Sequence, residues 1–407
     1  MTFGRQIEAL TIGIYIYDRT HRPLDLGWLG LVQALPVILL AIPGGHLADR
    51  FERRRILMGT LAVNMLIALG LLFCTYYDAP LSGIYLLLFF GACSAALGGA
   101  SRAALLPQIV SPDRFPNAVT WNSSVFQMAS MTGPAMGGLL VGLGTDRNAF
   151  HLAFAAVVVC RLLSLAGIAA LRCARRLSTT VSTSFRDLSA GVRFVWNTRL
   201  ILAPITLDLF AVLFGGATYL LPVFAKDILH INAWQLGVLR SSEAVGAVFM
   251  AMLIAHLPPM RRAGRTLLWA VAGFGAATII FGLSTSFWLS LVMMFLIGAF
   301  DNVSVVVRHT LVQMLTPDHM RGRVSAVNNV FIVASNDLGG LESGFVAWLL
   351  TPVLAVVSGG VGTLLVVLGA ARLWPEILAL GSLKDIRPAQ AIEAEKLADE
   401  EYADRGP

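Results

Sequence analysis

Four acidic side chains lie within long apolar stretches of the sequence, where a charged group is hardest to accommodate. They are Asp208, Asp301, Asp337 and Glu342. An ionised side chain inside a membrane-spanning helix costs about 3 kcal/mol or more if it faces lipid, so each one indicates a function unless a partner neutralises it. Each of the four is therefore a candidate for a carboxylate that takes up and releases a proton.

Nearby arginines offer the alternative that some acids are only neutralised. Asp301 and Arg308 are seven residues apart, so they share one helix face at a separation of two turns. Arg240 and Glu243 are three residues apart and can neutralise each other directly, which is the preferred interpretation of Glu243. For Arg161 the sequence names no partner.

The composition places the chain among membrane proteins. Of its 407 residues 57% are hydrophobic and 13% are charged, with a mean hydropathy of +0.74. One soluble core cannot bury that much apolar surface, so the surrounding solvent must be lipid. The net charge of +6 does not indicate a nucleic-acid partner, because the arginines fall at the ends of apolar runs instead of forming one stripe.

The sequence contains no pattern typical of an enzyme or a metal site. It shows no nucleophile with a nearby base and no soluble domain beyond a short tail, so we expect no enzymatic activity, no cofactor and no metal. The cysteines have neither metal-ligand spacing nor an obvious extracellular pairing, and are expected to be small buried hydrophobic residues. They are Cys74, Cys93, Cys160 and Cys173.

Apolar runs of about 20 residues can cross the hydrocarbon layer of a bilayer as helices. The runs lie near 26–48, 56–77, 79–101, 115–145, 149–171, 200–222, 234–257, 266–300 and 343–371, with a further span near 324–350. The run 266–300 is broken at 284–286 and the run 343–371 at 351–352, so each holds two helices or most of two. With the first segment they predict an all-α membrane protein of twelve helices.

The first segment is short for a span. Residues 3–17 number 15 and include Glu8, a further candidate proton carrier. Two interpretations stay open: the first helix is truncated by a translation start placed too far downstream, or it is a tilted or cavity-facing helix. No small-residue cleavage site follows the run, so a signal peptide is not expected.

The distribution of positive charge predicts the orientation. Alternate loops hold 18 Lys and Arg on one side and four on the other. Because loops rich in Lys and Arg stay in the cytoplasm, the richer set is expected to be cytoplasmic, with both termini on that side of a bacterial inner membrane.

The turn 44–55 joins two of these runs, and the chemistry of its residues indicates a role. Gly45 permits close helix approach, and the carboxylate of Asp49 can accept charge-assisted hydrogen bonds from arginines or a helix N-terminus. Arg50, Arg53 and Arg54 hold the loop on the cytoplasmic side. A turn of this kind can latch two helix bundles together on one face of the membrane.

These residues resemble the signature of the major facilitator superfamily (MFS), in which Gly, Asp-Arg and a final basic pair stand at fixed spacing. Glu52 occupies the position where the family more often has Gly. The resemblance implies two six-helix bundles that rock about a central cavity. It also implies that the latch stabilises the state closed to the cytoplasm.

The boundaries of these bundles can be placed along the chain. We expect an N-terminal six-helix bundle at 1–172, a cytoplasmic linker at 173–199, a C-terminal bundle at 200–374 and a polar cytoplasmic tail at 375–407. Apolar residues at helical spacing within 185–196 predict an interfacial helix in the linker.

The two halves resemble each other at an offset of 206 residues, which places Arg102 on Arg308 and Asn122 on Asn328. Such a repeat is typical of a transporter built from two parallel copies. Arg102 and Arg308 are expected to brace the cytoplasmic loops. Asn122, Asn328 and Asn329 either line the cavity or bond between helices.

A second motif lies in the fifth predicted span. Gly133, Pro134, Gly137 and Gly138 resemble the end of the MFS antiporter motif, although Ala129 stands where that motif has Gly. Small residues and proline also permit a bend and close helix packing, which is sufficient to explain them. The resemblance implies export.

Further segments resemble the MFS branch that contains the enterobactin exporter and related bacterial effluxers. They are 220–225, 298–301, 321–328 and 335–339. This resemblance implies an exporter of a small drug-like compound or siderophore, driven by proton antiport through one of the four carboxylates. The expected partners are the bilayer, the substrate and protons, and the protein is expected to be a monomer.

Two other functions remain open. A transporter of the same fold can move a lysophospholipid or another lipid-like substrate, and a membrane sensor need not transport at all. Release of substrate into the bilayer instead of water distinguishes the first alternative from an exporter.

Overall fold

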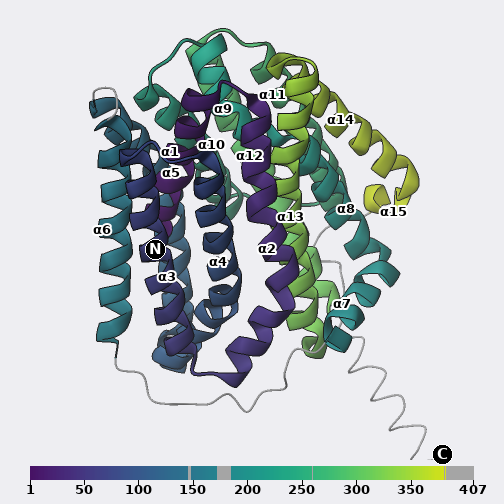
Figure 1. The fold of residues 1–407 in the computed structure, drawn as a ribbon. Helices are drawn as coiled ribbons and strands as arrows, with labels where there is room; N and C mark the ends of the chain where they lie inside the picture. Colours follow the sequence, from purple (N-terminus) through teal and green to yellow (C-terminus); the bar gives the residue numbers. More distant parts are fainter. Residues whose placement is uncertain (145–147, 172–184, 259, 380, 382–407) are drawn as a thin grey trace, which may run out of the picture.

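The computed structural model describes residues 1–144, 148–171, 185–258, 260–379 and 381 (Figure 1). Over these residues the chain is helical and contains no strand. The first half contains α1 (Thr2–Thr20), α2 (Pro23–Arg50), α3 (Arg53–Tyr76), α4 (Leu81–Ile109), η1 (Pro112–Arg114), α5 (Phe115–Leu143) and α6 (Asn148–Ala170).

The second half begins with α7 (Phe185–Asn197), within the predicted linker. The seventh span is broken into α8 (Arg199–Phe214), η2 (Gly216–Leu220), α9 (Leu221–Val223) and the π-helical η3 (Phe224–Ile228). The remaining helices are α10 (Ala233–His256), α11 (Ala263–Leu283), α12 (Phe287–Leu315), α13 (Asp318–Leu349), α14 (Pro352–Leu373) and α15 (Pro375–Ala379). The predicted twelve-helix fold is confirmed.

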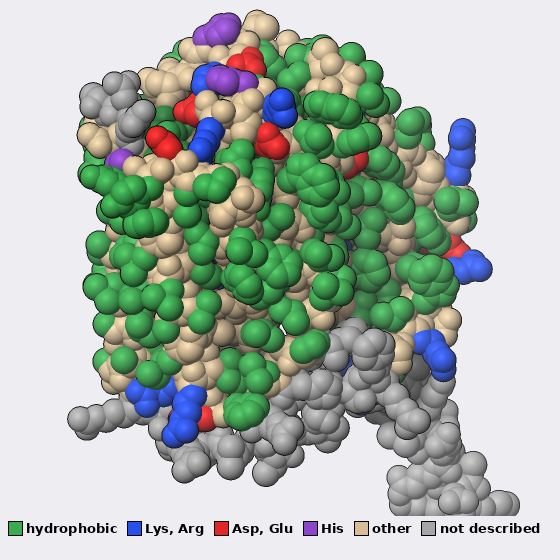
Figure 2. Space-filling model, in the orientation of Figure 1, with side chains coloured by type: hydrophobic (Ala, Val, Ile, Leu, Met, Phe, Trp, Pro, Cys, Tyr) green, Lys and Arg blue, Asp and Glu red, His purple; other side chains and the backbone are tan. Residues whose placement is uncertain are grey.

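Nine of the spans among the described residues are apolar enough to cross a membrane by length and hydropathy alone. Three long helices, α1, α5 and α13, do not meet this criterion. All three pack against the opposite bundle or carry charged side chains toward it. Their polarity therefore reflects the faces that they turn away from lipid. In Figure 2 a broad belt of hydrophobic side chains separates charged groups at the two ends of the molecule.

The helices α1–α6 and α8–α14 form two bundles, which meet where α2 packs on α13 and α5 packs on α10. The face that contains Arg53–Arg55 and the end of α6 is called the arginine-rich face below, and the face that contains Asp18 and Lys226 is called the opposite face. Figure 1 shows α2 and α13 side by side in the middle of the molecule.

The hydrophobic clusters show where the bundles touch. One large cluster lies toward the opposite face and contains residues of both bundles, among them Leu29, Leu71, Phe224 and Phe281. Toward the arginine-rich face the clusters are separate: Leu57, Leu61 and Leu105 belong to one bundle, and two further clusters belong to the other. Among the described residues the bundles therefore share a hydrophobic cluster near the opposite face, whereas toward the arginine-rich face each bundle has clusters of its own.

Glycines make the closest approaches between the bundles possible. A Cβ on Gly138 of α5 would lie 2.3 Å from the backbone oxygen of Ala233, and one on Gly344 of α13 would lie 2.7 Å from the Cα of Gly27. Helices in lipid associate through close packing instead of apolar burial, so small residues at a crossing strengthen it. Both crossings lie near the opposite face.

Candidate functional site

A cluster of charged side chains lies between the bundles. Asp337 of α13 accepts a hydrogen bond of 2.7 Å from the hydroxyl of Tyr219 in η2. The charge of Arg5, from α1 of the other bundle, acts on both groups. Gly340 leaves room for the Tyr219 ring, because a Cβ there would lie 2.7 Å from it. Asp337 therefore faces the seam between the two bundles.

A second group of charges lies on α10 and α12. Arg240 forms an ion pair with Glu243, and the charge of Glu243 also acts on Asp301. The two helices approach closely because Gly298 of α12 lies against the Glu243 backbone. Among the described residues no cation pairs directly with Asp301, so it lies under the influence of Glu243 without an ion-pair partner of its own. The predicted pairing of Arg240 with Glu243 is present.

Asp208 has a different environment from the other three acids. It forms an ion pair with Arg308 inside the C-terminal bundle, and Ser304 donates a longer hydrogen bond of 3.4 Å to Asp208. Both charged groups are almost completely buried, with exposed fractions of 5% and 3%. Arg308 thus pairs with Asp208 of α8 and not with Asp301, its neighbour on the same helix. Sequence spacing could not reveal a partner 100 residues away.

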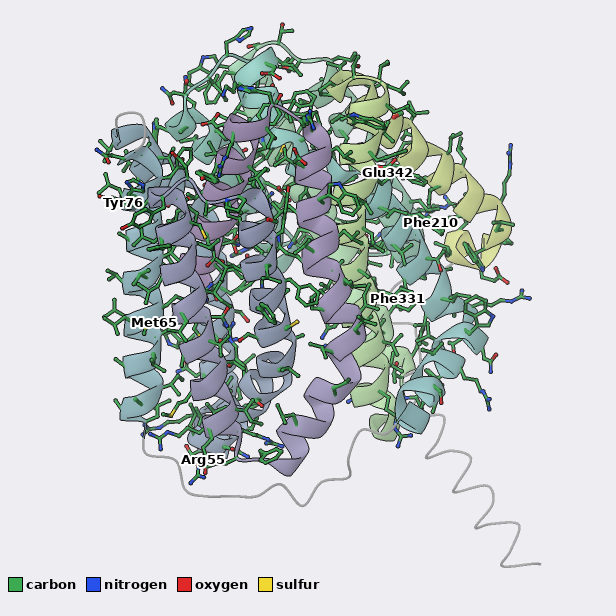
Figure 3. All side chains as sticks on the ribbon, in the orientation of Figure 1. Arg55, Met65, Tyr76, Phe210, Phe331 and Glu342 are labelled. Atoms are coloured by element: carbon green, nitrogen blue, oxygen red, sulfur yellow. The ribbon has the colours of Figure 1, made fainter. Side chains whose placement is uncertain are left out.

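Glu342 lies in the half of α13 that is nearer the opposite face, far from Arg55 in Figure 3. Its carboxylate accepts a hydrogen bond of 3.3 Å from Ser343, and the neighbouring Gly344 packs against α2. Glu342 therefore belongs to the closed end of the molecule, whereas Asp301 and Asp337 lie deeper between the faces.

The predicted latch is only partly described. Gly45, Asp49 and Arg50 lie in the last turns of α2, but their side chains are outside the described part of the structure. Arg53 is the first residue of α3. Arg54 donates hydrogen bonds to the carbonyls of Ile168 at 3.4 Å and Ala169 at 2.7 Å.

These contacts of Arg54 stay within the N-terminal bundle. The carbonyls belong to the last turn of α6, where a cation is favoured by the helix dipole and by unpaired carbonyl groups. Glu52, on the same turn, pairs with Arg55 at 2.8 Å.

The antiporter-like motif lies at two helix crossings. Gly133 and Gly137 of α5 pack against Gln6 and Ile7 of α1, whereas Gly138 packs against α10 of the other bundle. Pro134 has no backbone N–H, and the N–H of Ala135 bonds to the hydroxyl of Ser241 in α10 at 3.1 Å. The motif therefore connects three helices and both bundles.

Other polar residues of the sequence have separate places. Arg161 pairs with Glu8 at 2.8 Å, a contact between α6 and α1 that the sequence did not reveal. Arg102 donates to the hydroxyl of Thr2 at 3.2 Å, so it reaches α1. The three asparagines that the sequence offered as cavity residues differ in exposure: Asn122 and Asn329 are exposed, and Asn328 is buried.

Two contacts join the bundles at the opposite face. Asp18 of α1 forms an ion pair of 2.6 Å with Lys226 of η3. The neighbouring Tyr17 donates a hydrogen bond to Asp227. The two residues of each contact are about 210 positions apart in the sequence, so no local pattern could have indicated these contacts. Together they form a polar clamp, Tyr17–Asp18 against Lys226–Asp227, over the shared hydrophobic cluster.

Removing this clamp should loosen the opposite face. In Lys226→Ala we expect the fraction of molecules separated at that face to rise about 1.4- to fivefold, because exposed ion pairs contribute about 0.2–1 kcal/mol. The distance between spin labels at Ser82 and Thr285, in a background without the native cysteines, measures this fraction. Arg199→Ala is the control, since Arg199 pairs with Glu376 within one bundle. Equal distance distributions in both variants would contradict a clamp role.

Two six-helix bundles with charged groups between them are the arrangement of major facilitator superfamily transporters, and the family model that matches this chain belongs to that superfamily. Residues 3–407 match the model of the family described as Transmembrane secretion effector, and the chain belongs to that family. Because this is a family of transporters, the expectation that the chain is not an enzyme is confirmed.

Relatives with names are similar along most of the chain. It is 26% identical over 362 residues to the enterobactin exporter EntS of Shigella dysenteriae, covering 88% of this chain and 85% of that protein. The enterobactin exporter EntS of Citrobacter koseri is 26% identical over 383 residues, covering 93% and 89%.

Solved structures show the same fold. A bacterial homolog of the human lysosomal transporter Spinster, in an inward-facing and unoccupied conformation, has a TM-score of 0.71 at 16% identity and covers 95% of this chain and 96% of its own. The xylose transporter XylE from Escherichia coli, in its inward open conformation, has a TM-score of 0.68 at 14% identity, covering 97% and 96%.

Proposed function

We propose that this protein exports a small organic molecule of the siderophore or drug-like class across a bacterial inner membrane, by alternating access and in exchange for protons. The named relatives are enterobactin exporters, and the family is one of secretion effectors. In this proposal the protein acts as a monomer and needs no cofactor.

The observation that carries the proposal is that the bundles are joined by a hydrophobic cluster near one face and have separate clusters toward the other. The bundles share a hydrophobic cluster near the opposite face, and polar side chains are exposed where they separate. On α5 both Asn122 and Trp121 are exposed, Trp121 by 66%, and on α13 Asn329 and Asn336 are exposed. Polar residues within membrane spans are favoured only where they face a cavity or a partner.

The arginine-rich face is assigned to the cytoplasm in this proposal. The 18 Lys and Arg on that side against four on the other favour this orientation, with both termini inside. The open cavity then loads from the cytoplasm, as an exporter requires.

The proton site is assigned to Asp301 with Glu243. Arg240 pairs with Glu243, and Asp301 has no ion-pair partner among the described residues, so the three side chains together carry one excess negative charge when all are ionised. One proton neutralises that excess inside the membrane, where an uncompensated charge is costly. Asp208 is less suitable, because the buried Arg308 already neutralises it. Glu342 lies at the closed end, and Asp337 is held by Tyr219.

The experiment that tests the function is export from cells. The chain is expressed in bacteria that lack their own efflux pumps, and loss of enterobactin, catechol siderophores, dyes and antibiotics is followed with and without a protonophore. Export that the protonophore abolishes supports the proposal. Protonophore-insensitive release, or exclusive release of lysophospholipid into the bilayer, would contradict it.

The latch gives a further test of the mechanism. Asp49→Asn removes the carboxylate that is proposed to hold the cytoplasmic side closed after loading, so the export rate should fall about tenfold at equal expression, the loss of one charge-assisted contact. Glu52→Gln is the matched control on the same turn, because Glu52 pairs only with the exposed Arg55 among the residues described. Unchanged export in Asp49→Asn would remove the latch from the mechanism.

A further inference from the structure

We propose that Arg5 and Arg102 form a binding subsite for an anionic group of the transported molecule. The inference rests on the proposed function and deepens it, because it names a chemical feature of the substrate. A carboxylate, phosphate, sulfonate or ionised catechol fits the subsite by the same chemistry.

The two arginines come from different helices of the N-terminal bundle and lie near each other. Arg102 of α4 donates to the hydroxyl of Thr2 in the first turn of α1, and Arg5 follows one turn later on that helix. The charge of Arg5 acts on Arg102. Two like charges are therefore held together by the fold.

Both side chains lie at membrane depth. Gly4, next to Arg5, packs against Cys160 in the middle of α6, and Figure 1 places the N-terminus about midway between the two faces. Arg102 is seven residues from the end of α4 at Ile109. Both arginine residues are nevertheless exposed. A guanidinium at this depth is strongly disfavoured in lipid, so these two face the cavity.

What distinguishes these arginines is the lack of a direct acidic partner. The arginines in the middle of other spans are each paired with a carboxylate: Arg161 with Glu8, Arg240 with Glu243 and Arg308 with Asp208. In the described residues neither Arg5 nor Arg102 forms such a pair. The charge of Arg5 acts on Asp337, but that carboxylate is held by Tyr219 on the other bundle.

The chemistry of the guanidinium group suits this task. It presents several N–H donors in a planar fork that matches carboxylate and phosphate oxygens, and it keeps its charge at any physiological pH. Two such groups without a carboxylate between them leave donors available to a ligand that enters from the open side. An anion bound there neutralises charge that the fold leaves uncompensated.

A matched pair of probes tests the subsite. Binding of 2,3-dihydroxybenzoate and of its neutral amide, 2,3-dihydroxybenzamide, is measured by tryptophan fluorescence with the purified full chain in nanodiscs. We expect the acid to bind about tenfold more tightly than the amide, because hydrogen bonds to charged groups contribute about 1.5–3 kcal/mol. Equal affinities, or no binding of either probe, would overturn the proposal.

Variants then assign the preference to the two side chains. In Arg5→Gln and in Arg102→Gln the ratio of the two affinities should fall to about two or less, whereas Arg5→Lys should retain part of it. Arg199→Gln, which lies outside the cavity, should leave the ratio unchanged. A ratio that persists in both Gln variants contradicts the assignment even if their overall affinity falls.

The result is separable from the proposed function. Probe binding to purified protein requires neither a proton gradient nor export. A preference for the acid without protonophore-sensitive export would leave the subsite standing and overturn the exporter. Protonophore-sensitive export with no preference for the acid would leave the exporter standing and overturn the subsite.

Discussion

Asp301→Asn should abolish proton-driven export while leaving the protein able to exchange substrate. In this variant Arg240 and Glu243 form a neutral pair, and the excess negative charge that the proton is proposed to neutralise is gone. Reconstituted into vesicles with a pH gradient, the variant should accumulate substrate at least about tenfold less, which corresponds to about 1.4 kcal/mol of lost coupling. Exchange of labelled for unlabelled substrate without a gradient should persist, because it needs no net proton movement.

Glu342→Gln is the matched control for this experiment. Glu342 is also an acid within a span, but it lies at the closed end and bonds to Ser343. Its substitution should change gradient-driven accumulation less than about twofold, the effect of one weak contact. If Asp301→Asn accumulates substrate normally and Glu342→Gln does not, the proton site belongs to Glu342 instead.

The sequence predicted the fold because lipid imposes strong constraints on composition and length. Charge-free runs and the resemblance of the turn 44–55 were enough to predict twelve helices in two bundles. The pairing of Arg240 with Glu243 was also predictable, because a spacing of three residues on a helix brings side chains together.

The sequence could not show which acids are neutralised across helices. Arg161 had no nameable partner, yet it meets Glu8, 153 residues away, because α1 packs on α6. Arg308 had a plausible neighbour in Asp301 on its own helix, and the packing of α12 on α8 gave it Asp208 instead. Tertiary contacts of this kind depend on how helices rotate about their axes, which residue spacing along one helix does not determine.

The clamp at the opposite face and the pair Arg5 and Arg102 were missed for a related reason. The clamp joins α1 to η3 of the other bundle, and Arg102 reaches Thr2 where α4 meets α1 within the N-terminal bundle. Of these residues the sequence singled out only Arg102, which was expected to brace the cytoplasmic loops, because Lys, Arg and Asp are ordinary near helix ends. The pair Arg5 and Arg102 stands out only when the ion-pair partners of all the arginines within the spans are compared.

Asp208→Ala should destabilise the protein far more than it changes the chemistry of transport. The substitution leaves the guanidinium of Arg308, only 3% exposed, without its carboxylate. Breaking a buried ion pair by removing one partner costs about 3–5 kcal/mol, since the remaining charge is then buried and uncompensated. The temperature at which the purified protein loses its monodisperse state should therefore fall clearly below that of the parent protein.

The double variant Asp208→Ala/Arg308→Met decides between a structural and a coupling role for this pair. Replacing both charges by apolar groups removes the uncompensated guanidinium, so thermal stability should recover to near the parent value. If gradient-driven export recovers with it, the pair only holds α8 to α12, and Asp301 with Glu243 remains the proposed proton site. If stability recovers while export stays lost, Asp208 takes part in coupling, and the proton path runs through the core of the C-terminal bundle instead of its seam with the N-terminal one.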